Sequence, residues 1–305
     1  MDISIIIVNW NTKRLLLDCL ASVFKTVQKV SMEIWVVDNA SIDGSVEAVR
    51  HSYPDVKIIQ NSKNLGFAAA NNKAFKRMMG RYALLLNTDT VLTEGAVKSL
   101  YTFMEDNPDA GMVCGQLLNQ DGSKQNSIAS FPGITSLILN ETLLRILLPK
   151  QYPSKRREYN GPIEVDSGIG ACLMVRKKTM DHVGLLDEDY FFFFEETDWA
   201  RRIKQAGWKI YFIPSAKITH FQGQSVGHDI NSRILYYESR YIYFKKWHPD
   251  HYSIIRWIIF IRLLVNAGLN LAAVTGTLGI QKDIQKRLAL YTQLIRWHIR
   301  RCSTD

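Results

Sequence analysis

Asp89, a carboxylate at the end of an apolar run, is the residue in this sequence whose position most clearly indicates a chemical role. The run Tyr82–Leu86 continues into Asn87-Thr88-Asp89. An apolar run between polar flanks predicts a buried strand, and ligands of open α/β sheets bind beyond the carboxyl ends of strands. A carboxylate at such a place could hold a divalent metal against a phosphate. Alternatively, Asp89 could cap a helix that begins near Thr93.

Three other predicted strands are also followed by polar or small residues. These strands cover residues 3–8, 33–37 and 56–59, and the residues that follow them are Asn9, Asn11, Asp38, Asn39, Asp43, Asn64 and Gly66. Each group alone is typical of a turn. Because the carboxyl ends of parallel strands share one edge of a sheet, the groups together predict a ligand crevice at that edge.

A second set of residues that could take part in chemistry lies farther along the chain. Four phenylalanines, 191–194, precede Glu195, Glu196 and Asp198, which open a predicted helix that runs to about Ala206. Acidic residues at a helix N-terminus are favoured by the helix dipole, so their role could be structural. A carboxyl group beside an apolar wall can also have a raised pKa, which suits a general base.

The elements that must position these residues alternate between strand and helix. Helical periodicity follows Asn11-Thr12, and helices are also expected at 45–51 and 71–79. Alternation of this kind predicts an α/β fold with a parallel sheet and right-handed crossovers. The dinucleotide fingerprint G-x-G-x-x-G does not follow the first strand. Further strands are expected at 111–118, 163–176 and 208–213, so that residues 1–225 form a single domain.

The composition is that of a globular protein with a basic C-terminal part. The chain has 305 residues, of which 47% are hydrophobic and 22% charged, and its formal net charge is +9. Residues 251–305 contain eight Lys or Arg and only two Asp or Glu. This asymmetry predicts an anionic partner for the C-terminal part, such as a membrane surface.

The cysteines and the N-terminus indicate a cytoplasmic catalytic part. The four cysteines are far apart in the sequence and none forms a C-x-x-C pair, which argues against a zinc site and a disulfide framework. The first residues lack both the basic region and the long apolar run of a signal peptide.

Residues 226–305 are expected to form a helical extension. Residues 263–281 carry no charge and make a weak candidate for a membrane span. At 100° per residue, the C-terminal segment has Ile284, Leu288, Tyr291, Ile295 and Ile299 on one face and Lys282, Lys286, Arg296 and Arg300 on the other. A basic amphipathic helix of this kind suits an anionic membrane surface. Packing against the catalytic domain and a true membrane span are the alternatives.

Taken in order, these motifs resemble those of the GT-A-fold glycosyltransferases of family 2, in particular the bacterial rhamnosyltransferase-like enzymes of surface polysaccharide assembly. The matching segments are 5–11, 37–45, 64–67, 87–89, 170–172 and 191–201. The resemblance covers roughly residues 3–225. It implies a Rossmann-like α/β fold with a mixed, mainly parallel sheet flanked by helices.

The resemblance also implies a donor site. Asp38 would bind the nucleobase or ribose, Gly66 would permit close approach of the nucleotide, and Asp89 would bind Mg²⁺ or Mn²⁺. Asp89 would be the metal-binding end of the D-x-D motif, whose first position is Asn87 here. His220 lies where related enzymes supply a metal-binding histidine, although a lone histidine could instead make a structural hydrogen bond. The full donor set is Asn9, Asp38, Asn39, Asp43, Asn64, Gly66, Asn87, Asp89 and Gly170.

The catalytic base of the family is the second residue of a Glu-Asp pair. Here the pair is Glu195-Glu196, so Glu196 is favoured and Glu195 is the other assignment. Asp198 would support the site by pairing with Arg201 at i, i+3.

The activity implied is an inverting, metal-dependent transfer of a sugar, with rhamnose as the first choice. The donor would be dTDP- or UDP-linked and the acceptor a saccharide, lipid-linked, at the inner face of the cell membrane. No nucleic acid partner is expected. One alternative is a sugar-phosphate nucleotidyltransferase, which would carry a Gly-rich loop where Asn9-Trp10-Asn11 stands. The other is a non-catalytic nucleotide-sugar-binding module, which would be expected to have lost Asp89 or the acidic cluster.

Overall fold

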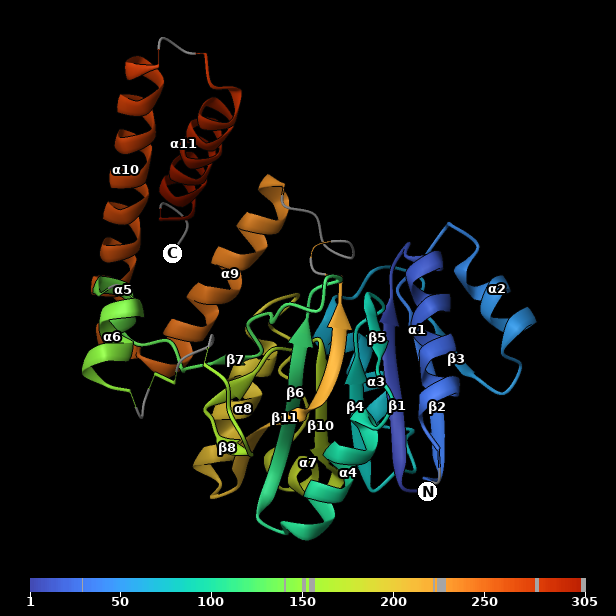
Figure 1. Cartoon of the computed structure of the whole chain (residues 1–305). Coiled ribbons are helices and arrows are strands. Elements are labelled where there is room, and N and C mark those ends of the chain that lie inside the picture. The colour runs from blue at the N-terminus through green and yellow to red at the C-terminus, as the bar shows by residue number, and fades with distance from the viewer. Residues whose placement is uncertain are drawn as a thin grey trace. The chain divides into compact units, whose positions relative to one another are not determined.

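The computed structural model describes residues 1–28, 30–139, 141–149, 152–153, 157–221, 223, 229–277 and 280–302. The chain divides into two compact units (Figure 1), Met1–Phe131 with Arg145–Ser225, and Pro132–Leu144 with Val226–Asp305. We expected residues 132–144 in the first domain, but this segment packs with the helices of the second unit. Part of the reason is a hydrogen bond from the guanidinium of Arg262 to the backbone carbonyl of Leu137.

The first unit is built on a nine-stranded mixed sheet of the α/β class that the sequence predicts. The main path of the sheet has the order β3-β2-β1-β4-β10-β6-β11-β5, and β8 pairs with β11. Strand β1 pairs in parallel with β2 and β4, and β6 pairs in parallel with β11, whereas β10 is antiparallel to both neighbours. The strands are β1 (Ile3–Asn9), β2 (Met32–Asp38), β3 (Lys57–Gln60), β4 (Tyr82–Leu86), β5 (Thr90–Leu92), β6 (Ala110–Leu118), β8 (Ile163–Glu164), β10 (Cys172–Arg176) and β11 (Lys209–His220), and a separate pair is β7 (Ile128–Ala129) with β9 (Ser167–Gly168).

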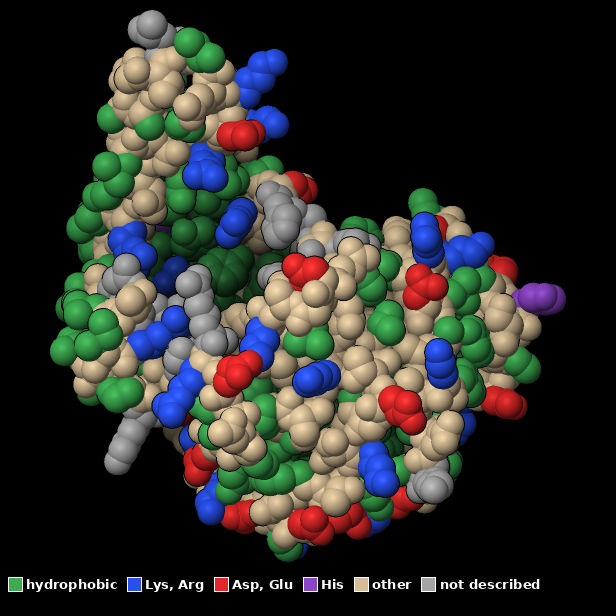
Figure 2. Space-filling model, in the orientation of Figure 1, with side chains coloured by type: hydrophobic (Ala, Val, Ile, Leu, Met, Phe, Trp, Pro, Cys, Tyr) green, Lys and Arg blue, Asp and Glu red, His purple; other side chains and the backbone are tan. Residues whose placement is uncertain are grey.

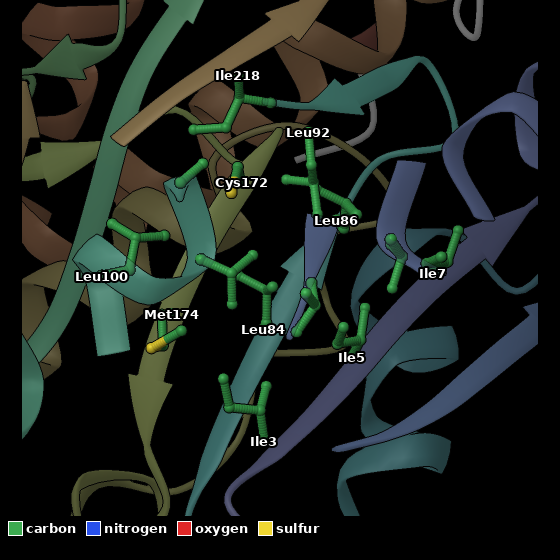
Figure 3. Packing of buried hydrophobic residues seen from close by; sticks show 14 of the residues in the cluster. Ile3, Ile5, Ile7, Leu84, Leu86, Leu92, Leu100, Cys172, Met174 and Ile218 are labelled. Carbon is green, nitrogen blue, oxygen red and sulfur yellow. The ribbon is translucent and has the colours of Figure 1, made fainter. Parts of the chain in front are cut away.

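Helices cover both faces of this sheet because side chains alternate along each strand. Ile3, Ile5 and Ile7 pack with α1 (Lys13–Thr26), α2 (Ser45–Ser52) and α4 (Ala96–Asp106) on one face, part of which Figure 3 shows beside Leu84 and Leu86. Ile6 packs on the other face with α3 (Phe67–Phe75), α7 (Lys177–Val183) and α8 (Glu195–Gln205). Burial of each such side chain stabilises the fold by about 1.5–3 kcal/mol.

Strand β11 is longer than the sequence indicates. We expected a strand over 208–213, but pairing with β6 continues to Thr219 after a register shift between Ile213 and Lys217. The shift accommodates Pro214, which has no backbone N–H to donate to the sheet. The longer strand carries His220 to the same edge as the loops described above.

The predicted strand over 163–176 is instead three short strands. β8 pairs with β11, β9 pairs with β7, and β10 pairs with both β4 and β6. Gly168 permits one of these crossings, since a Cβ there would lie 2.5 Å from the Cβ of Cys114.

The second unit is helical. Its helices are α5 (Ile134–Ile138), α9 (Ile230–Trp247), the 3-10 helix η1 (Pro249–His251), α10 (Tyr252–Gly276) and α11 (Lys282–Cys302), while α6 (Glu141–Leu147) crosses the boundary between the units. Helix α10 buries Ile255, Ile259 and Leu263 within the unit. Most of the apolar face that we predicted for α11 is half-buried rather than exposed. Among the described helices, only Pro249–Gly276 is long and apolar enough to cross a membrane.

Candidate active site

The loops after β1 and β2 are joined by a buried polar network. Because the two strands are parallel and in register at Asn9 and Asp38, the side chains at these positions meet. The Nδ2 of Asn9 donates to Oδ1 of Asp38 at 2.9 Å and to Oγ of Ser41 at 3.0 Å. The other oxygen of Asp38 accepts from the backbone N–H of Ser41 at 2.9 Å. Asp38 is therefore held rigidly at the carboxyl edge of the sheet.

The same network extends to the loop before α3. Asn39 donates to the carbonyl of Gly66 at 3.0 Å, and its Oδ1 accepts from Asn61 at 2.8 Å. Asn64 stabilises the turn by accepting from the N–H of Gly66 at 2.9 Å. The three predicted loops thus form one hydrogen-bonded structure.

Asp89 and His220 face each other across the sheet edge. Strands β5 and β11 are antiparallel and pair Thr90 with His220, which brings His220 next to Asp89. The Nε2 of His220 lies 3.5 Å from Oδ1 of Asp89, and both residues are buried. The backbone carbonyl of Asp89 also accepts from the N–H of Phe221 at 2.8 Å. Two residues that are 131 positions apart in the sequence therefore form one potential ligand pair.

The segment Gly170–Ala171 connects this pair to the acidic cluster. The backbone carbonyl of Ala171 accepts from the N–H of Asn87 at 3.0 Å. A Cβ on Gly170 would lie 3.7 Å from Cγ of Glu196, so this glycine lies directly against the Glu196 side chain. The predicted donor residues and the predicted base thus border one another.

Glu195 and Glu196 begin helix α8 in an apolar environment. Burial raises the pKa of Glu195 well above its usual range, and the negative charge of Glu196 raises it further. Burial also raises the pKa of Glu196. Glu195 is only 4% exposed, whereas Glu196 is half-buried. Within the described residues, Oε2 of Glu195 has no hydrogen-bond partner. Of the two, Glu196 is the more accessible, and Glu195 is the group whose pKa burial raises further.

Comparison with protein families decides the class of the chain. The family model described as glycosyl transferase family 2 matches residues 4–184. This chain belongs to glycosyl transferase family 2. It is a glycosyltransferase, as the motifs predicted, and the nucleotidyltransferase and non-catalytic alternatives are set aside.

Two curated relatives extend the match beyond the family model. The N-acetylglucosaminyl-diphospho-decaprenol L-rhamnosyltransferase of Mycobacterium tuberculosis is 26% identical over 247 residues, which cover 75% of this chain and 80% of that protein. The low-salt glycan biosynthesis hexosyltransferase Agl10 of Haloferax volcanii is 24% identical over 208 residues, which cover 67% of this chain and 62% of that protein.

Solved structures share the fold. The mannosyltransferase PcManGT of Pyrobaculum calidifontis, in complex with GDP-Man and Mn²⁺, aligns with a TM-score of 0.56 at 16% identity and covers 96% of this chain and 84% of its own. GalNAc-T7 with UDP, GalNAc and Mn²⁺ aligns with a TM-score of 0.59 at 15% identity and covers 98% of this chain and 57% of its own. These alignments confirm the GT-A architecture of the glycosyltransferase.

The Asp89–His220 pair fits a divalent metal. A carboxylate oxygen and an imidazole nitrogen are both common metal ligands. Two atoms 3.5 Å apart can both lie about 2.1 Å from one cation. No group of three or more His, Cys, Asp or Glu side chains in the described part of the chain is arranged as a metal site. The protein would thus supply two ligands and leave other positions for diphosphate oxygens and water.

Several predicted residues have structural partners in addition to any role toward the donor. Asp43 accepts hydrogen bonds from the N–H of Lys13 at 2.8 Å and from Ser45, so it holds the starts of α1 and α2 together. Burial acts to raise the pKa of Asp43, but these hydrogen bonds outweigh it and lower the pKa. Gly66 has φ +81°, and a Cβ there would lie 2.3 Å from the carbonyl oxygen of Phe191. The close approach at Gly66 is therefore to the protein's own backbone, not only to a nucleotide as we expected.

Asp198 differs most from its predicted role. It is fully buried and accepts from Nε of Arg202 at 2.9 Å, at i, i+4 rather than i, i+3. The Arg202 guanidinium also donates to the carbonyls of Val183 and Leu185. Arg201, the partner that we expected, lies over the ring of Phe131. Asp198 thus fixes α8 to the segment after α7 and positions the helix that carries Glu196.

Two features of the site had no clear signal in the sequence. The non-glycine residues with positive φ among those described are Asn11, Ala40, Phe193 and Phe194, and all of them lie in the loops of this site. Such strain is typical of functional loops, but phenylalanine gives no hint of it. The second feature is Gln125, whose Oε1 lies 2.9 Å from Nδ1 of His220. It lies 95 residues from His220 in the sequence, so only the fold brings the two together.

Proposed function

We propose that this glycosyltransferase moves a sugar from a nucleoside-diphosphate donor to a saccharide hydroxyl with inversion at the anomeric carbon. The observation that carries the proposal is the arrangement of Asp89 and His220 at one end of a contact chain and Glu196 at the other. Asn87, Ala171 and Gly170 are the residues between them. A donor diphosphate at the first end would place its sugar toward the second.

Glu196 acts as the general base. Its carboxylate accepts the proton of the acceptor hydroxyl while the oxygen of that hydroxyl forms a bond to the anomeric carbon. The bond from this carbon to the diphosphate oxygen breaks, and its electron pair leaves with the nucleoside diphosphate. One displacement from the opposite face inverts the configuration and needs no covalent intermediate. The raised pKa of Glu196 brings the base closer to neutral pH, where proton transfer is efficient.

Asp89 and His220 hold the donor end. When bound, Mg²⁺ or Mn²⁺ supplies positive charge that stabilises the leaving diphosphate. Asn9, Asp38 and Asn39 keep the loops around the nucleotide in place through the hydrogen bonds described above. The low exposure of Asp89, 1%, strengthens electrostatic interactions at this position.

One relative supports a substrate class for this chain. The relative in Mycobacterium tuberculosis is named as a rhamnosyltransferase of a decaprenol-diphosphate-linked sugar. For this chain we infer a dTDP- or UDP-linked donor, with rhamnose as the first choice, and a lipid-linked saccharide in surface polysaccharide assembly. The basic unit 226–305 supports a place at the inner, anionic face of the cell membrane, with the catalytic unit in the cytoplasm.

Donor binding tests the proposal most directly. Titration calorimetry with dTDP, UDP and GDP, with and without Mn²⁺, should show tight binding of one diphosphate only when the metal is present. Asp89→Asn should weaken that metal-dependent binding by about tenfold or more, because it removes the only carboxylate of the pair. Asp181→Asn, at an exposed acid on α7, is the matched control and should bind normally. Chelator-insensitive binding and transfer would contradict the metal site.

A further inference from the structure

The outer face of α10 is apolar and exposed, and none of the described elements of the second unit covers it. The exposed side chains along it, which are 44–65% accessible, are Ile254, Trp257, Ile261, Leu264 and Val265. Figure 2 shows hydrophobic side chains in green at the surface of the helices α10 and α11. At 100° per residue these five residues occupy an arc of about 100°. We call this set the α10 stripe. A contiguous apolar surface of this kind indicates contact with a protein or a membrane.

The opposite face of α10 already has a partner. Ile255, Ile259 and Leu263 are buried within the unit, and α11 packs along the helix. The stripe is therefore a second apolar face of α10, separate from the face that packs in the core of the unit. A helix that crosses a bilayer alone would bury its whole circumference in lipid, whereas here one face is packed and the other exposed.

The charges around the stripe favour an anionic lipid surface over a second copy of the chain. Residues 226–305 contain twelve Lys or Arg and five Asp or Glu, so two such units would repel each other. Arg256 and Arg262 flank the stripe on opposite sides, each more than about 100° from its centre, and of the two the guanidinium of Arg262 is hydrogen-bonded to the carbonyl of Leu137. Arginine beside an apolar face can keep its charge at the headgroups while its stem lies in the apolar layer.

A pocket borders the stripe between α10 and α11. It has a volume of about 320 Å³ and is lined by Ser253, Arg256, Trp257, Phe260, His298 and Ile299. Its polar wall carries a hydroxyl and a guanidinium, which suit a phosphate group. Its apolar wall includes Trp257, which also belongs to the stripe.

We propose that the α10 stripe lies in the interface of an anionic phospholipid bilayer and that the adjoining pocket takes a lipid phosphate. This assigns the membrane contact to α10 rather than to the amphipathic face of α11 that the sequence indicates. It rests on the proposed lipid-linked acceptor, which requires the enzyme to work at a membrane.

Vesicle flotation of the full chain tests this proposal. The wild type should bind vesicles of phosphatidylglycerol and phosphatidylcholine and bind pure phosphatidylcholine weakly. Ile261→Lys/Leu264→Lys adds positive charge, so a purely electrostatic contact would strengthen. If the stripe enters the interface, partitioning should instead fall by about tenfold or more. Met79→Lys places one such lysine on an exposed apolar residue of the catalytic unit and should change nothing.

Further variants separate the outcomes. Arg256→Gln should reduce the preference for anionic over neutral vesicles, while Arg256→Lys should retain most of it. Unchanged binding of the stripe variant would overturn the proposal, and so would dimerisation of the wild type that the variant abolishes. Transfer to a water-soluble acceptor without vesicle binding would overturn the membrane contact but leave the proposed function intact.

A second inference, carried by different contacts, concerns Gln125. Its Nε2 donates to the backbone carbonyl of His220 at 2.6 Å and to Oδ1 of Asn119 at 2.7 Å. Both acceptors require the amide nitrogen, so the amide oxygen must face Nδ1 of His220, 2.9 Å away. An amide oxygen only accepts, and Nδ1 therefore carries a proton.

This arrangement fixes the tautomer of the histidine. With the proton on Nδ1, a neutral His220 presents the lone pair of Nε2 toward Oδ1 of Asp89. That lone pair is what a metal ligand requires. We infer that Gln125 is a positioning residue that holds His220 ready to bind the metal.

The test compares two buried amides. Gln125→Met keeps the size of the side chain but removes the acceptor, so Mn²⁺ affinity in the presence of nucleoside diphosphate should fall by about 10–100-fold. Nitrogen-detected NMR should show that His220 has lost its single tautomer. Gln125→Glu keeps the acceptor that faces Nδ1 but loses the two donations of the amide nitrogen, so it should keep the proton on Nδ1. Gln116→Met is the control for the loss of a neighbouring buried amide, because Gln116 donates to Ser127 and to the backbone carbonyls of Leu117 and Gln125 but makes no hydrogen bond to His220 in the described structure. Unchanged Mn²⁺ affinity and tautomer in Gln125→Met would overturn the inference.

Discussion

The two units of this glycosyltransferase depart from the usual distribution of side chains in opposite ways. In the catalytic unit, polar and acidic side chains are buried, including Asp38, Asp89 and Glu195. In the helical unit, large apolar side chains such as Trp257 and Ile261 are exposed. Buried acids and exposed apolar faces both cost free energy in an isolated protein.

This difference in exposed and buried side chains indicates what kind of partner each unit suits. Asp38 and the asparagines of the neighbouring loops are already hydrogen-bonded to one another, so these loops are ordered in advance for a charged ligand. The exposed apolar face of α10 has no such internal order and suits a fluid, extended partner. The first unit is prepared for a molecule of defined geometry and the second for a surface.

The largest expected effect is at the base of the catalytic unit. Glu196→Gln should lower transfer by about 10²–10⁴-fold with little change in donor affinity, because only proton transfer is lost. In the wild type, activity should decline as pH falls through the raised pKa of Glu196, since the base must be deprotonated. Steady-state kinetics and calorimetry measure the two quantities.

Glu195→Gln is the matched control for that prediction. Because Glu195 retains its proton more strongly, replacing it with a neutral amide should change transfer by less than about tenfold. A larger loss in Glu195→Gln than in Glu196→Gln would exchange the two roles.

The internal order of the catalytic loops can be broken at Gly66. Gly66→Ala should lower the free energy of unfolding by about 2–4 kcal/mol, since it combines an unfavourable φ with a clash against the Phe191 carbonyl. Gly122→Ala has a similar φ of +79° but open space, and should cost about 1 kcal/mol. Urea unfolding measures both. Equal losses would mean that the loops adjust easily and are not ordered in advance.

The helical unit should affect transfer only where the acceptor lies in a membrane. Ile261→Lys/Leu264→Lys should reduce transfer to an acceptor in anionic vesicles by about tenfold relative to transfer to a short water-soluble acceptor. The ratio of the two rates is the measurement. An equal loss on both acceptors would show that the two units do not divide the work in this way.

The smallest expected effect is on the free energy of unfolding, which the burial of Glu195 lowers. The folded state holds the proton of Glu195 more tightly than the unfolded state, so stability falls as pH rises from the usual value of 4.5 through the raised pKa. Glu195→Gln removes this dependence and should raise the free energy of unfolding at pH 8 by on the order of 1 kcal/mol. At pH 4 the variant and the wild type should be similar. A variant less stable at both values would indicate that the carboxylate has a favourable partner.

The sequence predicted the strand-end residues well because their positions depend on local rules. Apolar runs that end in Asn9, Asp38 and Asp89 require only that parallel strands share an edge. The α/β fold followed from the same runs, and the mixed sheet and the family followed from the resemblance that the motifs carry.

The sequence did not indicate features that depend on contacts between distant segments. The strand that we predicted over 208–213 continues past Pro214, because the sheet accommodates this proline with a register shift. The pairing of Gln125 with His220 and the packing of 132–144 on α10 also join parts of the chain that no periodicity relates. Helix α11 is amphipathic as predicted, but the apolar face of a helix can be covered by a neighbouring helix as well as by lipid.

The register shift in β11 has a consequence for how the chain can change over evolutionary time. Between Ile213 and Lys217, three residues of β11 have no partner on β6, and pairing then resumes as far as Thr219. Side chains alternate along a strand, so loss or gain of one residue between Lys217 and His220 would turn the imidazole to the opposite face of the sheet. The irregular segment before Lys217 can absorb changes in length, whereas the three residues after it cannot. Descendants of this sequence are therefore expected to tolerate insertions next to Pro214 and to keep the spacing from Lys217 to His220 fixed.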